Sequence, residues 1–385
     1  MKEKHLSERP CPVCGGKRGS VIVQLCYALF DDLDISGKKT LIECAQCGMF
    51  YDDVHFSEKQ LQEYYRRNEH YASSSVGGSG GFTKDSEERY DRIINLLEPD
   101  SSGIIIDFGC GQGGFVSRCL KHGLQAVGIE TSPKSLKLAQ ESGLCVYESL
   151  NSFINENDTT KIHAVVLSHV IEHLIDPANL VRVFAKYANG ALVYIEVPDA
   201  SSYLLPDAVC WHEMYFEHLS HFSERNIVEF AKRSFIDVNN NGKISFSKLQ
   251  ENVKCCYITG QFSLKQTQIE VPVFSGYGYK QVLQVPIKSL ENLMDNDSPL
   301  GLWGVSQYAM LLLGSCEKLA MRSKRIFDSS PAKIGRSIQG IVVESSNMLG
   351  TLSEDCILLI PKSNFLQQMF GILPETGFKG TAVEI

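Results

Sequence analysis

The stretch "DFGCGQGG" at residues 107–114 decides how the middle of this 385-residue chain is expected to fold. It follows the apolar run "GIIIDFG" (103–109) and leads into "GFVSRCLKHG", which has helical spacing. Gly109, Gly111 and Gly113 allow a tight turn and let the backbone approach a ligand where a Cβ atom would collide. The pattern therefore predicts a strand, a ligand-binding loop and a helix in succession.

The same alternation of strand and helix extends over residues 99–250. Further strand-like runs are "QAVGIE" (125–130), "LCVYES" (144–149), "HAVVLSHV" (163–170) and "GALVYIEVP" (190–198). The amphipathic segments among them close with a glycine, as helices often do. This order predicts an α/β fold with a doubly wound, mostly parallel sheet, in which ligands bind beyond the carboxyl ends of the strands.

Two kinds of ligand fit the glycine-rich loop. Gly109, Gly111 and Gly114 satisfy the GxGxxG pattern of dinucleotide-binding proteins, and glycine spacing alone does not decide between the two ligands. Glu130 ends the second strand, where a carboxylate can accept hydrogen bonds from ribose hydroxyls in either case. Asp107, however, puts a negative charge at the end of the first strand, which favours a cationic ligand over a pyrophosphate.

Three motifs together, "DFGCGQGG", "GIE" (128–130) and "SHVIEHLIDP" (168–177), resemble those of the class I S-adenosylmethionine-dependent methyltransferases. The resemblance covers about residues 85–245 and implies a seven-stranded, mostly parallel sheet with S-adenosylmethionine as cofactor. It also implies a set of cofactor-binding residues: Asp107, Gly109, Gly111 and Gly113 at the amino acid portion, Glu130 at the ribose, Glu148 or its neighbours near the adenine, and Ser168 and His169 by the sulfur.

Two CxxCG motifs lie near the N-terminus, and each places two thiolates where they can hold one ion. Four thiolates favour tetrahedral Zn²⁺ and leave no open position for catalysis, so we predict a structural zinc site. A redox pair or an iron–sulfur site is the alternative. The predicted ligands are Cys11, Cys14, Cys44 and Cys47.

The expected organisation has four parts. A zinc-binding domain spans residues 1–55, and a helical connector with a flexible flap spans residues 56–98. The methyltransferase domain covers residues 99–250, and a C-terminal Rossmann-like α/β domain covers residues 251–385. This order resembles that of the zinc-containing nucleotide-sugar C-methyltransferases, which act on nucleotide-linked deoxysugars.

The segment "EMYFEHLSHFSERN" (213–226) carries the most specific part of this resemblance. In the family a Tyr-x-Glu-His motif follows the fifth strand, and Tyr215, Glu217 and His218 match it. His221 stands where relatives usually carry an aromatic residue.

Carbon methylation requires removal of a proton next to a ketone, hence a base with a pKa near the working pH and a donor for the enolate oxygen. His218 suits the first role, Glu217 can fix its tautomer, and Tyr215 can donate to the oxygen. Ser223 also fits as the N-cap of the next helix. The resemblance adds His173, facing the substrate, and Tyr71, an aromatic residue that closes over the site.

The expected partner is a small molecule, by resemblance a nucleotide-sugar in sugar biosynthesis. A net charge of −8 argues against nucleic acid, and no apolar run is long enough to span a membrane. Thirteen scattered cysteines indicate reduced thiols and a cytoplasmic location. The oligomeric state stays open.

Two other functions stay open. The first is an O- or N-methyltransferase for another small metabolite. The second is a zinc-scaffolded binding protein without catalytic activity. In the C-terminal domain, Lys333 and Arg336 are candidates for phosphate contacts, with solvated surface residues as the preferred alternative.

Overall fold

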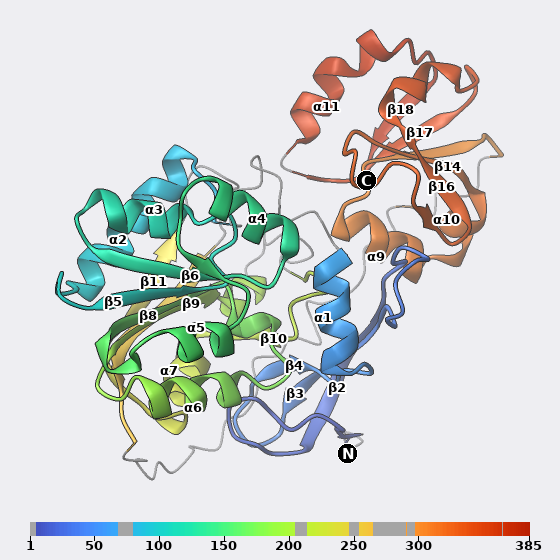
Figure 1. Cartoon of the computed structure of the whole chain (residues 1–385). Coiled ribbons are helices and arrows are strands. Elements are labelled where there is room, and N and C mark those ends of the chain that lie inside the picture. The colour runs from blue at the N-terminus through green and yellow to red at the C-terminus, as the bar shows by residue number, and fades with distance from the viewer. Residues whose placement is uncertain are drawn as a thin grey trace.

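The computed structural model describes residues 5–67, 80–204, 214–245, 254–264, 290, 297–363 and 365–385. Within these residues the chain forms three β-sheets, and Figure 1 shows them with their covering helices. Tyr71 and most of the predicted flap lie outside the described residues. Among the described residues, no helix combines the length and the apolar character that a membrane crossing requires.

The central sheet has seven strands in the order β11-β12-β9-β8-β5-β6-β7. β5 (Ile104–Phe108), β6 (Gln125–Ile129), β7 (Val146–Tyr147), β8 (Ile162–Ser168) and β9 (Leu192–Pro198) run parallel. β11 (Ile236–Ser245) and β12 (Lys254–Phe262) form an antiparallel hairpin that joins the edge of β9. The predicted seven-stranded, mostly parallel sheet is confirmed.

Helices cover both faces of this sheet. On one face, α2 (Lys84–Leu97), α3 (Gly114–Lys121) and α4 (Pro133–Glu141) bury apolar side chains in one cluster. On the other face, α5 (Leu150–Glu156), α6 (Pro177–Tyr187) and α7 (Glu224–Arg233) share a second cluster. Each amphipathic helix can bury its apolar stripe only against the sheet, which gives the doubly wound arrangement.

The N-terminal sheet contains a strand from a distant part of the chain. Its order is β1-β2-β3-β4-β10, with β1 (His5–Leu6), β2 (Arg18–Cys26), β3 (Lys38–Cys44) and β4 (Phe50–Asp52) from the N-terminus. The last strand, β10 (Ser220–His221), pairs antiparallel with β4. The segment predicted to carry the catalytic base therefore completes the sheet of the cysteine-containing module.

The C-terminal sheet has the order β15-β16-β14-β13-β17-β18. Its strands are β13 (Leu300–Trp303), β14 (Ser323–Asp328), β15 (Ser337–Ile338), β16 (Ile341–Ser345), β17 (Ile357–Ile360) and β18 (Thr381–Glu384). All pairs except β15–β16 are parallel, and β13, the first strand, lies between β14 and β17. This is the strand order expected of a Rossmann-like domain. Its helices are α9 (Gln307–Ser315), α10 (Glu317–Arg322) and α11 (Leu366–Ile372).

Two predicted boundaries are wrong. The segment 56–98 is more than a connector, because α2 packs on the central sheet and only α1 (Glu58–Arg67) lies outside it. The boundary at residue 250 falls inside the β11–β12 hairpin, so β12 belongs to the central sheet. Residue composition does not reveal this pairing, because β12 joins β9 across a long stretch of intervening chain.

The N-terminal and C-terminal units share an apolar core. Phe30 and Leu311 belong to the same buried cluster, and the backbone N–H of Ala28 donates to the carbonyl of Met310 at 2.8 Å. Arg336 lies at this junction, where its guanidinium carbon is 3.7 Å from the centroid of the Phe30 ring. The prediction of a phosphate contact for Arg336 is therefore replaced by a packing role.

Candidate active site

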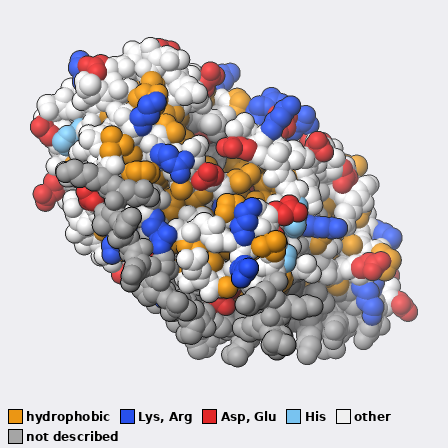
Figure 2. All heavy atoms as spheres, turned by 90° about the horizontal axis from the view of Figure 1, so that it is seen from below, with side chains coloured by type: hydrophobic (Ala, Val, Ile, Leu, Met, Phe, Trp, Pro, Cys, Tyr) orange, Lys and Arg blue, Asp and Glu red, His pale blue; other side chains and the backbone are white. Residues whose placement is uncertain are grey.

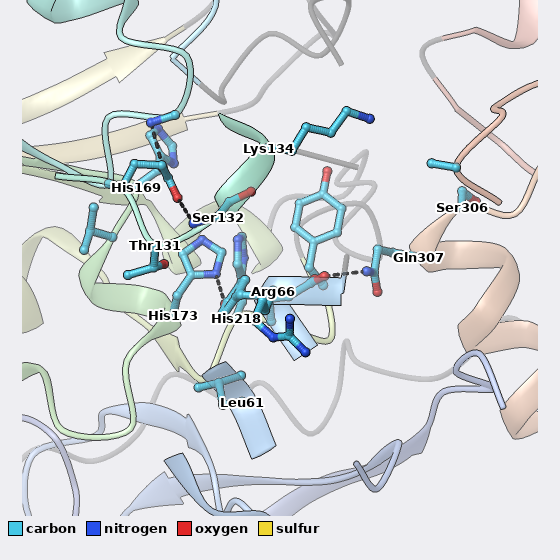
Figure 3. Close-up of a pocket in the computed structure, with 18 of the residues that line it drawn as sticks. Leu61, Arg66, Thr131, Ser132, Lys134, His169, His173, His218, Ser306 and Gln307 are labelled. Carbon is cyan, nitrogen blue, oxygen red and sulfur yellow. Dashed lines mark hydrogen bonds between the residues drawn. The ribbon is translucent and has the colours of Figure 1, made fainter. Parts of the chain in front are cut away.

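A cleft of about 2130 Å³ lies between the carboxyl ends of the central strands and those of the C-terminal strands. Figure 3 shows His169, His173 and His218 on one side of it, and Ser306 and Gln307 on the other. Basic, acidic and apolar side chains are interspersed over the face of the molecule in Figure 2, without a continuous basic patch. Parallel sheets place their binding sites at this end of the strands.

The glycine-rich loop has the conformation that its sequence predicts. Gly109, Gly111 and Gly113 have φ angles of +75°, +55° and +82°, which side chains rarely tolerate. A Cβ atom on Gly113 would lie 2.4 Å from Cδ1 of Leu144. The loop therefore requires glycine for its backbone and for its close packing.

Glu130 is fixed beside this loop. Its Oε2 accepts from the backbone N–H of Gly111 at 2.8 Å, and its Oε1 accepts from that of Ser132 at 2.7 Å. Burial raises the pKa of Glu130. Each carboxylate oxygen has a second lone pair, so the side chain can still accept a hydrogen bond from a ribose hydroxyl.

Asp107 is buried at the end of β5, with 6% of its surface exposed. Burial raises the pKa of Asp107 to about 7, against the opposing effect of Arg89 and with a further contribution from Glu130. A buried carboxylate of this kind favours a cation beside it.

Glu148 is exposed, whereas Ser149, Leu150 and Asn151 line the cleft. β7 ends at Tyr147, and the following helix α5 begins with Leu150 at the cleft. Of the predicted pair, Glu148 or its neighbours, the neighbours line the cleft, and the adenine contact stays a prediction.

Ser168 and His169 line the cleft, as expected for residues at the end of β8. His169 has a φ of +55° and is held between two carboxylates. Its Nε2 lies 3.2 Å from Oε1 of Glu196, and its Nδ1 lies 3.3 Å from Oε1 of Glu172. Burial and Arg89 lower the pKa of His169, but Cys255 and the hydrogen bond to Glu172 outweigh them and raise it well above its usual value.

Glu196 organises a group of residues that the sequence interpretation missed. Nε of Arg89 and Nη2 of Arg92 each lie 3.0 Å from its carboxylate, and Tyr194 donates to it. Arg89 also donates to Oγ of Ser168. The only signal in the sequence was a carboxylate inside the otherwise apolar run of β9.

His173, His218 and Tyr215 come together in the cleft. The ring centroids of His173 and His218 lie 4.9 Å apart, as do those of Tyr215 and His218. Burial lowers the pKa of His173, so this ring is neutral. The hydroxyl of Tyr65 lies 3.0 Å from Nδ1 of His173, and burial raises the pKa of Tyr65, so the tyrosine donates this hydrogen bond.

Glu217 connects the same segment to two other elements. Its Oε1 accepts from the hydroxyl of Tyr64 in α1 and from Nε2 of Gln307 in α9, the latter at 2.8 Å. These bonds hold the segment between α1 and the C-terminal domain. The proposed role of Glu217 toward the tautomer of His218 stays a prediction.

Two neighbouring residues have structural roles. His221 is buried beside the ring of Phe50. Its Nδ1 forms a hydrogen bond of 3.1 Å with the hydroxyl of Tyr203. Burial lowers the pKa of His221 well below its usual value, so it is neutral. Ser223 caps α7 by accepting from the backbone N–H of Asn226 at 3.3 Å, as the sequence predicts.

Lys333 lines the cleft but already has two partners. Its Nζ donates to the carbonyl of Val305 at 2.8 Å and to Oδ2 of Asp328 at 3.1 Å. These bonds fix the loop after β13, so Lys333 shapes the cleft and keeps one donor for a ligand.

The four predicted metal ligands converge on one point. Their sulfur atoms all lie within 4.8 Å of one another, with Cys11–Cys47 and Cys14–Cys44 separations of 3.5 Å. A tetrahedron with Zn–S bonds of about 2.3 Å has S–S edges of about 3.8 Å, whereas a disulfide requires about 2.05 Å. The arrangement therefore fits a tetrahedral Cys₄ ion site.

The comparisons with known proteins agree with the fold of the central part. Residues 82–234 match the family model described as "Methyltransferase domain". An uncharacterized methyltransferase of Geobacillus kaustophilus is 28% identical over 116 residues, which is 30% of this chain and 54% of that protein. The chain thus spans about half the length of the curated relative that it matches.

Solved structures resemble the same part more distantly. A S-adenosylmethionine-dependent methyltransferase from Archaeoglobus fulgidus aligns with 46% of this chain and 92% of its own, at 16% identity and a TM-score of 0.35. The [4+2]-cyclase SpnF aligns with 54% of this chain and 97% of its own, at 12% identity and a TM-score of 0.42. These values are too low to support an argument about function.

The family match and the glycine-rich loop concern the same segment, and the sheet extends from it to β12. The central part of the chain thus has the strand order expected of the class I methyltransferase fold, and residues 82–234 match the model of a methyltransferase domain.

Proposed function

We propose that this protein C-methylates a nucleotide-linked keto-deoxysugar, with His218 as the base that removes the proton next to the ketone. One observation carries the proposal: His218, Tyr215 and His173 meet in the cleft that joins the cofactor loop to the C-terminal domain. A histidine beside a phenol provides a base and a hydrogen-bond donor at the same point.

The size of the cleft supports a second ligand beside the cofactor. Its volume of about 2130 Å³ exceeds the roughly 300–1,000 Å³ of ordinary small-molecule pockets. The far side includes Trp303, which ends β13, and Gly304 and Ser306, which follow it at the point where the strand order of the C-terminal sheet reverses. Nucleotides bind at such reversals, so this side suits the nucleotide of the substrate.

The residues of this chain then have distinct tasks. His218 accepts the proton from carbon, and Tyr215 donates a hydrogen bond to the developing enolate oxygen. His173, neutral and held by Tyr65, presents an oriented ring to the substrate. S-adenosylmethionine, when bound at Glu130 and the glycine-rich loop, would supply the electrophilic methyl group.

The decisive experiment is mass spectrometry of the protein with a panel of nucleotide-linked keto-sugars and isotopically labelled S-adenosylmethionine. We expect a mass increase located on a carbon atom, and deuterium incorporation from D₂O at that carbon without cofactor. Label on a hydroxyl or amine would instead indicate the O- or N-methyltransferase. Undetectable turnover with tight binding of a nucleotide-sugar would indicate the binding protein.

The role of His218 is tested by His218→Ala with His221→Ala as the matched control. Both remove an imidazole from the same segment, but His221 is buried behind the cleft. Loss of a general base costs about 10²–10⁴-fold in kcat, which we expect only for His218→Ala. Unchanged kcat in this variant would refute His218 as the base.

A structural zinc ion at the four cysteines is part of the same proposal. The chemistry of the ligands supports it, because four soft thiolates in a tetrahedral arrangement prefer Zn²⁺ and leave no position for substrate.

A further inference from the structure

Lys39, a buried cation of the N-terminal module, contacts the backbone of the segment that carries His218. Its side chain is 1% exposed. Its Nζ donates to the carbonyl of Tyr215 at 3.1 Å, of Phe216 at 3.2 Å and of His218 at 2.7 Å. An ammonium group has three donors, so all three are used on this one turn.

Arg9, from the same module, contacts both loops that line the histidine side of the cleft. Its five N–H donors have five acceptors, which is the full capacity of a guanidinium. They are the carbonyls of Asp52 (3.2 Å), Leu174 (2.9 Å), Ile175 (2.9 Å) and Leu219 (2.6 Å), and Oγ of Ser220 (2.9 Å). Leu174 directly follows His173, and Leu219 directly follows His218.

The two loops are thus joined to each other through one side chain. The backbone adds a further bond, from the N–H of Leu219 to the carbonyl of Glu172 at 2.8 Å. The relative placement of the two histidine rings therefore depends on Arg9, which holds the residues that follow each histidine, and on Lys39, which holds the turn at residues 215–218.

The cysteine site anchors the elements from which both cations project. Arg9 lies two residues before Cys11, and its backbone N–H donates to Oδ1 of Asp53 at 2.9 Å. Lys39 lies on β3, which ends at Cys44. A metal ion that joins the knuckles fixes the positions of both elements at once.

We propose that Arg9 and Lys39 are positioning residues, and that the Cys₄ site keeps them in place to hold the two histidine-bearing loops in register. The inference rests on the proposed function only for the roles of His173 and His218. The hydrogen bonds that carry it involve Arg9, Lys39 and the loop backbones.

The test uses the full-length protein with Lys39→Met, which keeps the length of the side chain and removes its donors. Lys38→Met is the matched control, because Lys38 is the adjacent, exposed residue of β3. Hydrogen exchange followed by mass spectrometry should show residues 214–223 exchanging at least about tenfold faster in Lys39→Met only. Calorimetric titration should give the same affinity for S-adenosylmethionine in both variants.

A second readout reports on the histidines themselves. In protein with ¹³C-labelled histidine, the NMR chemical shifts of the His218 ring should change in Lys39→Met, because its contacts with His173 and Tyr215 change, and should not change in Lys38→Met. A role in stability alone would lower the melting temperature without moving these chemical shifts. If Lys39→Met does not fold, Lys39→Gln, which retains two donors, is measured in the same way.

Removal of the metal tests the coupling to the cysteine site. A chelator should accelerate exchange at residues 169–176 and 214–223, and should leave the glycine-rich loop protected. Unchanged exchange in both loops after removal of the metal, or equal acceleration over the whole chain, would overturn the proposal. These readouts need no turnover, so they stay informative even if the methylation proposal fails.

Discussion

Asp107 shows how burial alone can set the pH behaviour of a residue. Its pKa is raised to about 7 in the folded protein, above the value of 3.8 for an unperturbed group. Folding therefore takes up a proton between these values, and the stability linked to this proton is lost as the pH rises through about 7.

We predict that Asp107→Asn stabilises the protein without cofactor at pH 8 and has little effect at pH 4. The gain is at most about 4 kcal/mol, since each pKa unit corresponds to about 1.36 kcal/mol. Urea denaturation at both pH values measures it. Equal effects at pH 4 and pH 8 would mean that the carboxyl group is not desolvated.

Glu130 leads to a prediction about cofactor affinity. In Glu130→Gln, an amide NH₂ would face either the N–H of Gly111 or that of Ser132, so one of these donors loses its acceptor. The substitution also removes the charge that would accept hydrogen bonds from the ribose hydroxyls. A hydrogen bond to a charged group is worth about 1.5–3 kcal/mol, so the Kd for S-adenosylmethionine should rise by about 10- to 100-fold.

Glu148→Gln is the matched control for this measurement, since Glu148 is the first residue after β7, in the next strand–helix connection, but is exposed. Its Kd by calorimetry should stay within about twofold of the wild type. A large effect of Glu148→Gln would restore the adenine contact to Glu148 itself.

The conformation of the glycine-rich loop was predictable because it is determined locally. Gly109, Gly111 and Gly113 are required by the turn in which they lie, and Glu130 is fixed by its position at a strand end. Lys39 and Arg9 gave no such signal, because a lysine on a strand predicts a solvated surface. Their partners in the two histidine-bearing loops lie more than 150 residues away in the sequence.

Among the secondary-structure elements, α2 depends on one buried carboxylate. Arg89 and Arg92 of this helix both form ion pairs with Glu196 on β9, and Arg89 also donates a hydrogen bond to Ser168. The pKa of Glu196 is lowered, because the two arginines and His169 outweigh its burial. The stability from this group is therefore present at neutral pH and is lost as the pH falls below the usual range of a carboxyl group.

We predict that Glu196→Gln lowers the free energy of unfolding by about 3–5 kcal/mol at pH 7, as expected when a buried ion pair loses one partner. Glu63→Gln is the contrast, since Glu63 forms ion pairs with Arg66 and Arg67 on the exposed surface, and its loss should change the free energy of unfolding far less than Glu196→Gln does. Chemical denaturation of both variants checks the difference. Similar losses would show that Arg89 and Arg92 find other partners.

Elements with a strong local pattern were predicted well. The five parallel strands of the central sheet appear at the expected places because their apolar runs are bounded by glycines and helix caps. β10 was not predicted, because its two residues form a strand only through pairing with β4. Such pairing depends on tertiary structure and not on the propensity of Ser220 and His221.

At the scale of the whole molecule, we predict how much metal each chain binds. Elemental analysis should find one zinc per chain, and Cys44→Ser should lose it together with thermal stability. Cys26→Ser is the control, since Cys26 ends β2 within the spacer between the knuckles and is not part of the four-sulfur cluster. Iron in place of zinc, or metal retained in Cys44→Ser, would contradict a Cys₄ zinc site.

The arrangement of the three units was the least predictable level. The sequence indicated an N-terminal module beside a methyltransferase domain. It did not indicate that this module would contact both the histidine-bearing loops and the C-terminal core through Arg9, Lys39 and Phe30. Those contacts depend on surfaces that are complementary only after each unit has folded. No periodicity in the chain encodes them.

The pairing of β4 with β10 also has a consequence for biosynthesis. While the chain is being translated, β4 has an open hydrogen-bonding edge until residue 221 has left the ribosome, some 170 residues later. During this interval the nascent N-terminal module presents that edge to other chains. Expressed alone, residues 1–55 would keep this edge open permanently, and such a fragment is expected to self-associate through it.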